Sequence, residues 1–215
     1  MNIDHMIVEA KGTTPLIMNN GQMANPLNPL VKKLKSLTSK RNKTEDDLLE
    51  ILELQWEGAL YYSDDVGGLY IPSEMIFSSL SKAAKKHKMG PKISGITVDD
   101  PIGFPLITDH HESIVELRKD EKNRFDKMVV IMKARTLKRR AIFHNWKVKF
   151  DLEFERDIID PNEIKTLLQT QSCRVGFGDW APGHSKPGVY GKFIIENLTH
   201  VDSKGNKTVL KEKSL

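Results

Sequence analysis

The sequence has little of several features that would define its cellular setting. It contains one cysteine, Cys173, among 215 residues, so no internal disulfide can form and the chain fits a reducing compartment. No segment approaches the ~18 consecutive apolar residues that a membrane-spanning helix requires. The first residues, MNIDHMIVEAK, have neither the basic nor the apolar segment of a secretory signal peptide. We therefore expect a cytoplasmic protein without a membrane partner.

Arrangements typical of catalysis are also missing. The run Asp109-His110-His111-Glu112 offers metal-binding side chains, but neighbours on a strand point to opposite faces and rarely bind one ion together. His144 follows a basic segment and could act as an acid–base group in RNA cleavage, although a surface histidine on a strand is the favoured interpretation. The seven histidines show no paired spacing. We expect no enzyme, no cofactor and no metal ion.

What the sequence does have is segregated charge. Its 33 Lys and Arg residues exceed its 29 Asp and Glu residues only slightly, for a net charge of +4. The basic residues are concentrated in residues 32–43, 82–92, 133–140 and 204–213, and the acidic residues in residues 45–57, 99–109 and 151–163. Separate basic surfaces suit a polyanionic partner such as nucleic acid. The alternative for each basic run is an ordinary solvated surface.

Hydrophobic periodicity predicts both strands and helices. Apolar and polar residues alternate strictly over residues 146–154, which predicts a half-buried antiparallel strand with Trp146, Phe150 and Phe154 inside. The long strands are expected at residues 127–140 and 142–155, and others at 3–11 and 189–201, with a hairpin over 59–71. Helices are expected at 30–37, 44–58, 72–88 and from 160, where Asp160-Pro161-Asn162-Glu163 is a typical helix start.

This order of elements predicts an α+β fold. Two halves that each contain strands and a helix, with antiparallel neighbours, indicate a ferredoxin-like (RRM-like) antiparallel sheet core with inserted helical and irregular lobes. We expect a single domain over residues 1–215, with insertions at about residues 16–58 and 92–125.

The segment CRVGFGDWAPGHSKPGVYGKFII, residues 173–195, is unusually rich in glycine. Its glycines and prolines permit close approaches and stiff turns, and Arg174, Trp180 and Lys186 lie among them with one acid, Asp179. Such a loop can place its amides along a phosphodiester backbone while the indole offers a stacking surface. The alternative is a long surface loop between a helix and a strand.

Three segments together resemble the repeat-associated mysterious protein (RAMP) superfamily. They are GTTPLI at residues 12–17 after the first strand, YIPSEM at residues 70–75 before a helix, and the glycine-rich loop 176–191. The superfamily comprises RNA-binding backbone and processing subunits of CRISPR effector complexes. The resemblance is closest to the backbone subunits, which polymerise along a guide RNA, and it extends to small stand-alone proteins of this type carried by phages.

These observations lead to one preferred function and one alternative. We expect sequence-tolerant binding of single-stranded nucleic acid, RNA favoured over DNA, by a homo-oligomer or a subunit of a ribonucleoprotein. The expected binding residues are Lys133, Arg135, Lys138, Arg139, Arg140, Arg174, Trp180 and Lys186. The alternative is a protein-interaction or assembly component that mimics or occupies a slot in a CRISPR-type complex without nucleic-acid chemistry of its own.

Overall fold

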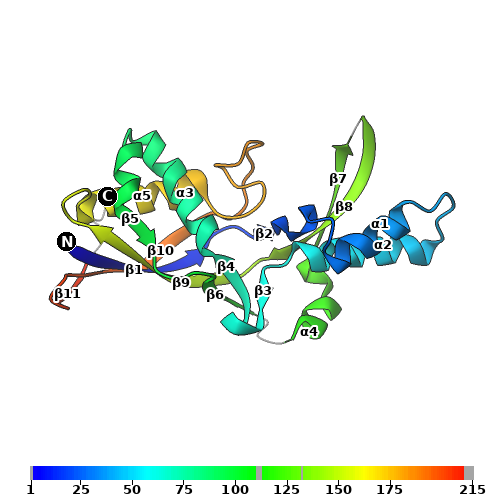
Figure 1. Cartoon of the computed structure of the whole chain (residues 1–215), viewed down its shortest axis with the longest axis horizontal. Coiled ribbons are helices and arrows are strands. Elements are labelled where there is room, and N and C mark those ends of the chain that lie inside the picture. Colours follow the sequence, from blue (N-terminus) through cyan, green and yellow to red (C-terminus); the bar gives the residue numbers. More distant parts are fainter. Residues whose placement is uncertain (1, 110–112, 132, 211–215) are drawn as a thin grey trace. The chain divides into compact units, whose positions relative to one another are not determined.

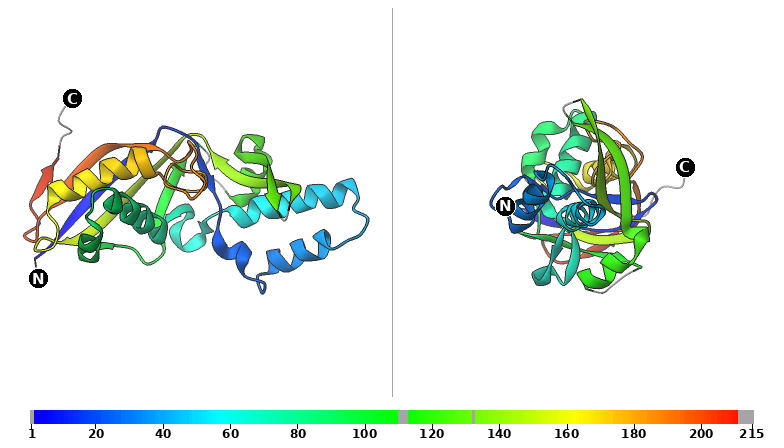
Figure 2. Two further views of the ribbon diagram at one scale, coloured as in Figure 1. Left: turned by 90° about the horizontal axis from the view of Figure 1, so that it is seen from above. Right: turned by 90° about the vertical axis from the view of Figure 1, so that its right-hand side faces the viewer.

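The chain folds into two compact units of mixed α+β structure with mostly antiparallel sheets (Figures 1 and 2). The computed structural model describes residues 2–109, 113–131 and 133–210. Unit 1 comprises Met1–Leu16, Tyr62–His111 and His144–Leu215, and unit 2 comprises Ile17–Tyr61 and Glu112–Phe143. The first segment of unit 2 coincides closely with the first expected insertion, whereas the second overlaps the expected 92–125 only in part. A single domain with insertions stays a prediction.

Unit 1 is built on a twisted antiparallel sheet. Its strands lie in the order β11 (Lys207–Val209), β10 (Phe193–Val201), β1 (Ile3–Gly12), β9 (Trp146–Glu155), β6 (Gly103–Thr108), β4 (Gly68–Pro72) and β3 (Tyr62–Ser63). The short strand β5 (Ile96–Val98) also pairs with β9. The N-terminal strand β1 is central, because it pairs along most of its length with both β9 and β10.

Two helices, α3 (Ser73–Lys86) and α5 (Pro161–Thr170), lie side by side on one face of this sheet (Figure 2). Helix α5 begins as expected, with a capping box between Asp160 and Glu163. The alternation in β9 is confirmed: Trp146, Phe150 and Phe154 are at most 2% exposed. Burial of this apolar face drives sheet and helices together, and leaves a polar face on the other side of the sheet.

Unit 2 combines a helical pair with a β-hairpin. Helices α1 (Pro29–Thr38) and α2 (Glu45–Ala59) pack through leucine and isoleucine side chains, with Leu37, Ile51 and Leu54 at the centre. Thr44 caps α2 as expected and forms a capping box with Asp47. A second sheet has the strand order β2 (Leu16–Met18), β8 (Ala134–Phe143) and β7 (Arg124–Ile131). All of it belongs to unit 2 except Leu16, and the unit also contains the short helix α4 (Ile114–Lys119).

The prediction of one strand over residues 127–140 is wrong. The segment is a hairpin in which β7 and β8 pair antiparallel, and Lys133 lies at the turn with a φ of 67°. The sequence offers no glycine, proline or asparagine there, so the usual turn signal is missing. Similarly, β9 begins at Trp146 rather than at residue 142, and β10 begins at Phe193 rather than at residue 189. The expected insertion at residues 92–125 contains the strands β5 and β6, which pair within the unit 1 sheet, and the helix α4. In the part of the chain that the structure describes, no helix has both the length and the apolar character to cross a bilayer.

Candidate nucleic-acid interface

The register of the β7–β8 hairpin separates its side chains into two faces. Lys127 pairs with Lys138 and Phe125 with Arg140, and directly opposed residues of an antiparallel pair share one face. We call this the basic face; it includes Phe125, Lys127, Val129, Thr136, Lys138 and Arg140. The second face carries the intervening residues, including Asp126 and Arg139. Of the five basic residues expected to bind here, Lys138 and Arg140 lie on the basic face, Arg135 and Arg139 lie on the second face, and Lys133 lies at the turn.

Lys138 lies on the basic face opposite Lys127 and close to Arg140. Its side chain is partly buried, and burial lowers the pKa of its ammonium group, with the nearby Arg140 guanidinium lowering it further. No carboxylate among the described residues forms an ion pair with Lys138. A cation that is partly desolvated beside a like charge is an unfavourable arrangement that a bound anion relieves. This is the arrangement expected of a phosphate contact.

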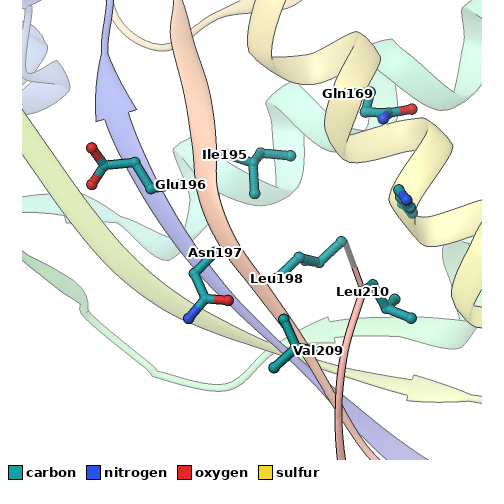
Figure 3. Close-up of a pocket in the computed structure, with 8 residues that line it drawn as sticks. Gln169, Ile195, Glu196, Asn197, Leu198, Val209 and Leu210 are labelled. Atoms are coloured by element: carbon teal, nitrogen blue, oxygen red, sulfur yellow. The ribbon is translucent and has the colours of Figure 1, made fainter. Parts of the chain in front are cut away.

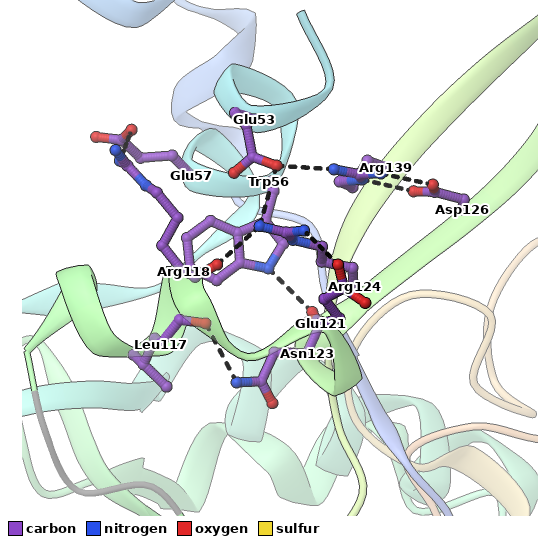
Figure 4. A network of polar contacts seen from close by, with 10 residues as sticks. All are labelled: Glu53, Trp56, Glu57, Leu117, Arg118, Glu121, Asn123, Arg124, Asp126 and Arg139. Atoms are coloured by element: carbon purple, nitrogen blue, oxygen red, sulfur yellow. Dashed lines mark hydrogen bonds and ion pairs between the residues drawn. The ribbon is translucent and has the colours of Figure 1, made fainter. Parts of the chain in front are cut away.

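Arg139, in contrast, is engaged within unit 2 (Figure 4). Its guanidinium binds both carboxylate oxygens of Asp126, at 2.7 Å from Nε and 2.8 Å from Nη2, and Glu53 of α2 at 2.8 Å from Nη1. Its side chain is only 11% exposed. The bonds to Asp126 and the charge of Glu53 raise the pKa of Arg139. These contacts fasten the hairpin to α2 and leave little of the guanidinium for a ligand.

Neighbouring residues extend this network at the base of the hairpin (Figure 4). Arg124 lies 3.3 Å from the same Glu53 carboxylate and donates to the Arg118 carbonyl at 2.8 Å. The buried Trp56 indole donates to the Asn123 carbonyl at 2.9 Å. The side chain of Gln55, also on α2, accepts a hydrogen bond from the Arg139 amide at 3.0 Å. Helix α2 therefore holds the base of the hairpin through both side-chain and backbone contacts.

The remaining expected residues of the hairpin are Lys133 and Arg135, and both are exposed. Lys133 is at the turn, where its positive φ is uncommon for a residue with a side chain. Arg135 opposes Val130 on the second face, beyond the Arg139 network. Their positions at the far end of the hairpin make them accessible to an extended polyanion.

The glycine-rich loop of unit 1 is anchored in the core at both ends. Phe177 is buried and stacks on Phe193, with ring centroids 4.7 Å apart. Gly191 has a φ of +66°, and a Cβ there would lie 1.8 Å from the Phe177 carbonyl oxygen, so only glycine fits. The Gly191 amide donates to Pro15 at 2.8 Å, and Ser79 of α3 donates to Gly176 at 2.8 Å. The loop thus contacts the segment 12–17 through Pro15, and helix α3, which follows the segment 70–75, through Ser79.

Arg174 lies in the π-helical turn Gln171–Val175 just before the loop, and Lys186 lies within the loop. Both are exposed, and Trp180 is half-buried. Trp180 has a φ of +50°, and its amide donates to Asp179 Oδ1 at 3.1 Å. The Asp179 side chain is 9% exposed and lies 3.4 Å from Nε2 of His184. The one acid of the loop therefore points inward, where it shapes the turn at Trp180, instead of facing an approaching phosphate.

The eight expected site residues fall into two groups. Lys133, Arg135, Lys138, Arg139 and Arg140 belong to unit 2, and Arg174, Trp180 and Lys186 belong to unit 1. Lys127 and Phe125 of the basic face are not among the expected residues, because a single strand over residues 127–140 does not bring them opposite Lys138 and Arg140. A turn placed at residues 132–133 would have paired Lys127 with Lys138 and revealed both.

Other candidate features do not extend this interface. A shallow cavity of about 260 Å³ beside β10 and α5 (Figure 3) contains none of the eight residues. It is lined by Lys165, Gln169, Ile195, Glu196, Asn197, Leu198, Val209 and Leu210. His144 is exposed. In the run 109–112, Asp109 accepts a hydrogen bond from Asn145 at 2.6 Å, and residues 110–112 lie outside the described residues.

The chain matches no protein-family model, and no curated protein matches it either.

Proposed function

We propose that the protein binds single-stranded nucleic acid, RNA in preference to DNA and with little dependence on sequence, as an oligomerising backbone-type subunit in the cytoplasm. The observation that carries the proposal is Lys138: a partly buried cation beside Arg140, opposite Lys127, without an ion pair to any described carboxylate. Phosphate groups would neutralise this cluster, and neutralisation of phosphates gives an affinity that falls with salt.

Aromatic groups complement the charges. Phe125 shares the basic face with these cations, and the half-buried Trp180 lies in the glycine-rich loop, which also carries the exposed Lys186 and follows the exposed Arg174. Every base has an aromatic surface, so stacking on such side chains contributes roughly 1–3 kcal/mol per base without reading sequence. Charge and stacking together support a sequence-tolerant interface.

The topology supports a ferredoxin-like core and RAMP-type membership as part of the proposal. The strands β1, β6, β9 and β10 occur with α3 and α5 in the chain order β-α-β-β-α-β, the arrangement of ferredoxin-like folds. In the sheet they lie as β10–β1–β9–β6. The hairpin and helices of unit 2 are then insertions after the first strand and before the third.

The test uses size-exclusion chromatography with light scattering on the purified chain, alone and with uridine oligonucleotides from about 10 to 60 nucleotides. We expect nucleic acid to co-purify, and complexes whose mass rises in steps of one protein chain as the oligonucleotide lengthens. Thymidine oligonucleotides of equal length should bind more weakly. A protein that remains free with every oligonucleotide at low salt contradicts the proposal.

A second candidate is the protein-interaction component. On the second face of the hairpin, Met128, Val130 and Leu137 are 56%, 69% and 39% exposed, and Met128 directly opposes Leu137. Exposed apolar side chains that neighbour one another are typical of interaction surfaces. This candidate expects the same columns to show association without nucleic acid, and expects Val130→Lys to abolish that association.

A further inference from the structure

A cluster of metal-binding side chains lies on the polar face of the unit 1 sheet, away from α3 and α5. It consists of His5, Asp99 and Asp151, and one ligand atom from each lies within 4.8 Å of the others. The register explains the meeting. Asp151 opposes Ile7 in the β1–β9 pair, so His5 is its diagonal neighbour. Asp99 follows β5, and its amide donates to the Asp151 carbonyl at 3.2 Å.

The separation of the donor atoms fits a small transition-metal ion. Nδ1 of His5 lies 3.3 Å from Oδ2 of Asp151. For a tetrahedral zinc ion with bonds of about 2.0–2.1 Å, two ligand atoms are about 3.3–3.4 Å apart. The two atoms form a hydrogen bond at this distance, which is also the spacing of two zinc ligands, and the exposed Asp99 offers a third ligand atom within 4.8 Å of one from each of the other two residues.

One carboxylate oxygen of the cluster has an unmet requirement. Oδ1 of Asp151 is buried and accepts no hydrogen bond from the described residues, although buried polar atoms normally have a partner. A cation shared by the Asp151 and Asp99 carboxylates would give this oxygen a partner and offset the repulsion between the two charges.

Glu153 lies close to the position of the outer carboxylate that metal-binding histidines usually have. It opposes His5 directly in the β1–β9 register, and its Oε1 lies 3.8 Å from Nε2 of His5, the nitrogen that faces away from Asp151. At 3.8 Å this contact is an ion-pair distance and not a hydrogen bond. A Glu153 carboxylate that moves onto Nε2–H when Nδ1 binds a metal would fix the ring orientation and make Nδ1 a better ligand. The order Glu153, His5, ligand position, Asp151 is that of a carboxylate–histidine–metal arrangement.

We propose that His5, Asp99 and Asp151 bind one divalent transition-metal ion, Zn²⁺ by preference, with Glu153 orienting the imidazole. One nitrogen and two oxygens suit Zn²⁺ better than Mg²⁺, which prefers an all-oxygen octahedron. Three protein ligands leave a fourth position for water. The ion would join β1, β9 and the residue after β5, and thereby stabilise the centre of the sheet.

The test is isothermal titration of the full chain, stripped of metal with EDTA and dialysed, with ZnCl₂ and separately with MgCl₂. We expect one Zn²⁺ per chain and at least tenfold weaker binding of Mg²⁺. His5→Gln and Asp151→Asn should each weaken Zn²⁺ binding at least tenfold. Glu153→Gln should weaken it about 10- to 100-fold while the stoichiometry stays at one.

The matched control is His184→Gln, which removes the histidine of another histidine–carboxylate pair and should leave Zn²⁺ affinity unchanged. Melting curves in EDTA establish that each variant is folded, and Co²⁺ gives an independent readout, because wild-type protein should show visible d–d absorption that His5→Gln loses. Zn²⁺ binding by His5→Gln at wild-type affinity, or no binding by the wild type, overturns the proposal.

Discussion

Replacement of Arg139 by methionine separates the structural role of this residue from nucleic-acid binding. The substitution keeps an unbranched side chain against the hairpin but removes the guanidinium that binds Asp126 and Glu53. Both carboxylates then lose their principal partner while Gln55 still accepts from the residue-139 amide. We therefore expect a loss of stability in unit 2 with the backbone pairing retained.

The magnitude follows from three charge-assisted hydrogen bonds and the exposure of the partners. Removal of one partner of a fully buried ion pair costs about 3–5 kcal/mol. Arg139 is 11% exposed, but Glu53 is 29% and Asp126 37% exposed, so water solvates the abandoned carboxylates in part and the cost is lower. We expect a loss of about 2–3 kcal/mol, between a surface pair and a buried one.

Hydrogen exchange measured by mass spectrometry localises the effect. Amides of α2 and of β7–β8 should exchange about 30- to 140-fold faster in Arg139→Met, the change that 2–3 kcal/mol corresponds to at a tenfold factor per 1.4 kcal/mol. Peptides from β1 and β9 in unit 1 should exchange as in the wild type. Urea unfolding gives the same comparison for the whole chain.

Arg135→Met is the matched control, because Arg135 is an exposed arginine on the same strand and the same face. It should change stability by no more than about 0.5 kcal/mol. If Arg139→Met is as stable as Arg135→Met and instead loses affinity for RNA, Arg139 is a ligand-binding residue and the structural reasoning is refuted.

Two further predictions concern the loop and the start of α2. Trp180→Ala should weaken RNA binding with little change in melting temperature, since Trp180 is half-buried. Phe177→Ala removes a buried ring and should lower the free energy of unfolding by about 3–5 kcal/mol. Equal destabilisation by both substitutions would make Trp180 a core residue. Lys40 and the Thr44 amide lower the pKa of Asp47, so its ionised form stabilises the fold above the ordinary carboxyl pKa, and this contribution is lost as the pH falls through the lowered value. Asp47→Asn should accordingly lower the melting temperature at neutral pH, and melting curves in strong acid should show no difference.

Sequence patterns predicted those parts of the fold that local chemistry determines. The alternation in β9 identified its buried face because the side-chain period of a strand is two. Asp160 and Thr44 identified the starts of α5 and α2 because a helix leaves its first amides unpaired. The β7–β8 turn could not be predicted, since Lys133 adopts a left-handed conformation without a residue type that favours it.

The candidate site was harder to predict from the sequence, because its properties depend on which residues face each other. Arg139 and Arg140 are neighbours in the sequence, yet one is tied to Asp126 and Glu53 and the other lies beside Lys138 on the opposite face. A run of basic residues in the sequence shows neither the strand register nor the acidic residues that neutralise some of its members. The His5, Asp99 and Asp151 cluster similarly arises from three segments that only the sheet brings together.

The most direct test of nucleic-acid binding is the salt dependence of RNA affinity, measured by fluorescence anisotropy with a labelled uridine oligonucleotide. Wild-type protein is compared with two triple variants. The basic-face variant combines Lys127→Gln, Lys138→Gln and Arg140→Gln. The control combines Lys32→Gln, Lys35→Gln and Lys85→Gln, which replace exposed lysines of α1 and α3. Each phosphate contact on a single strand contributes about 0.7 to the slope of log affinity against log salt. We predict that the basic-face variant loses about 2 from this slope and the control loses little; equal slopes for all three proteins would contradict binding through the hairpin.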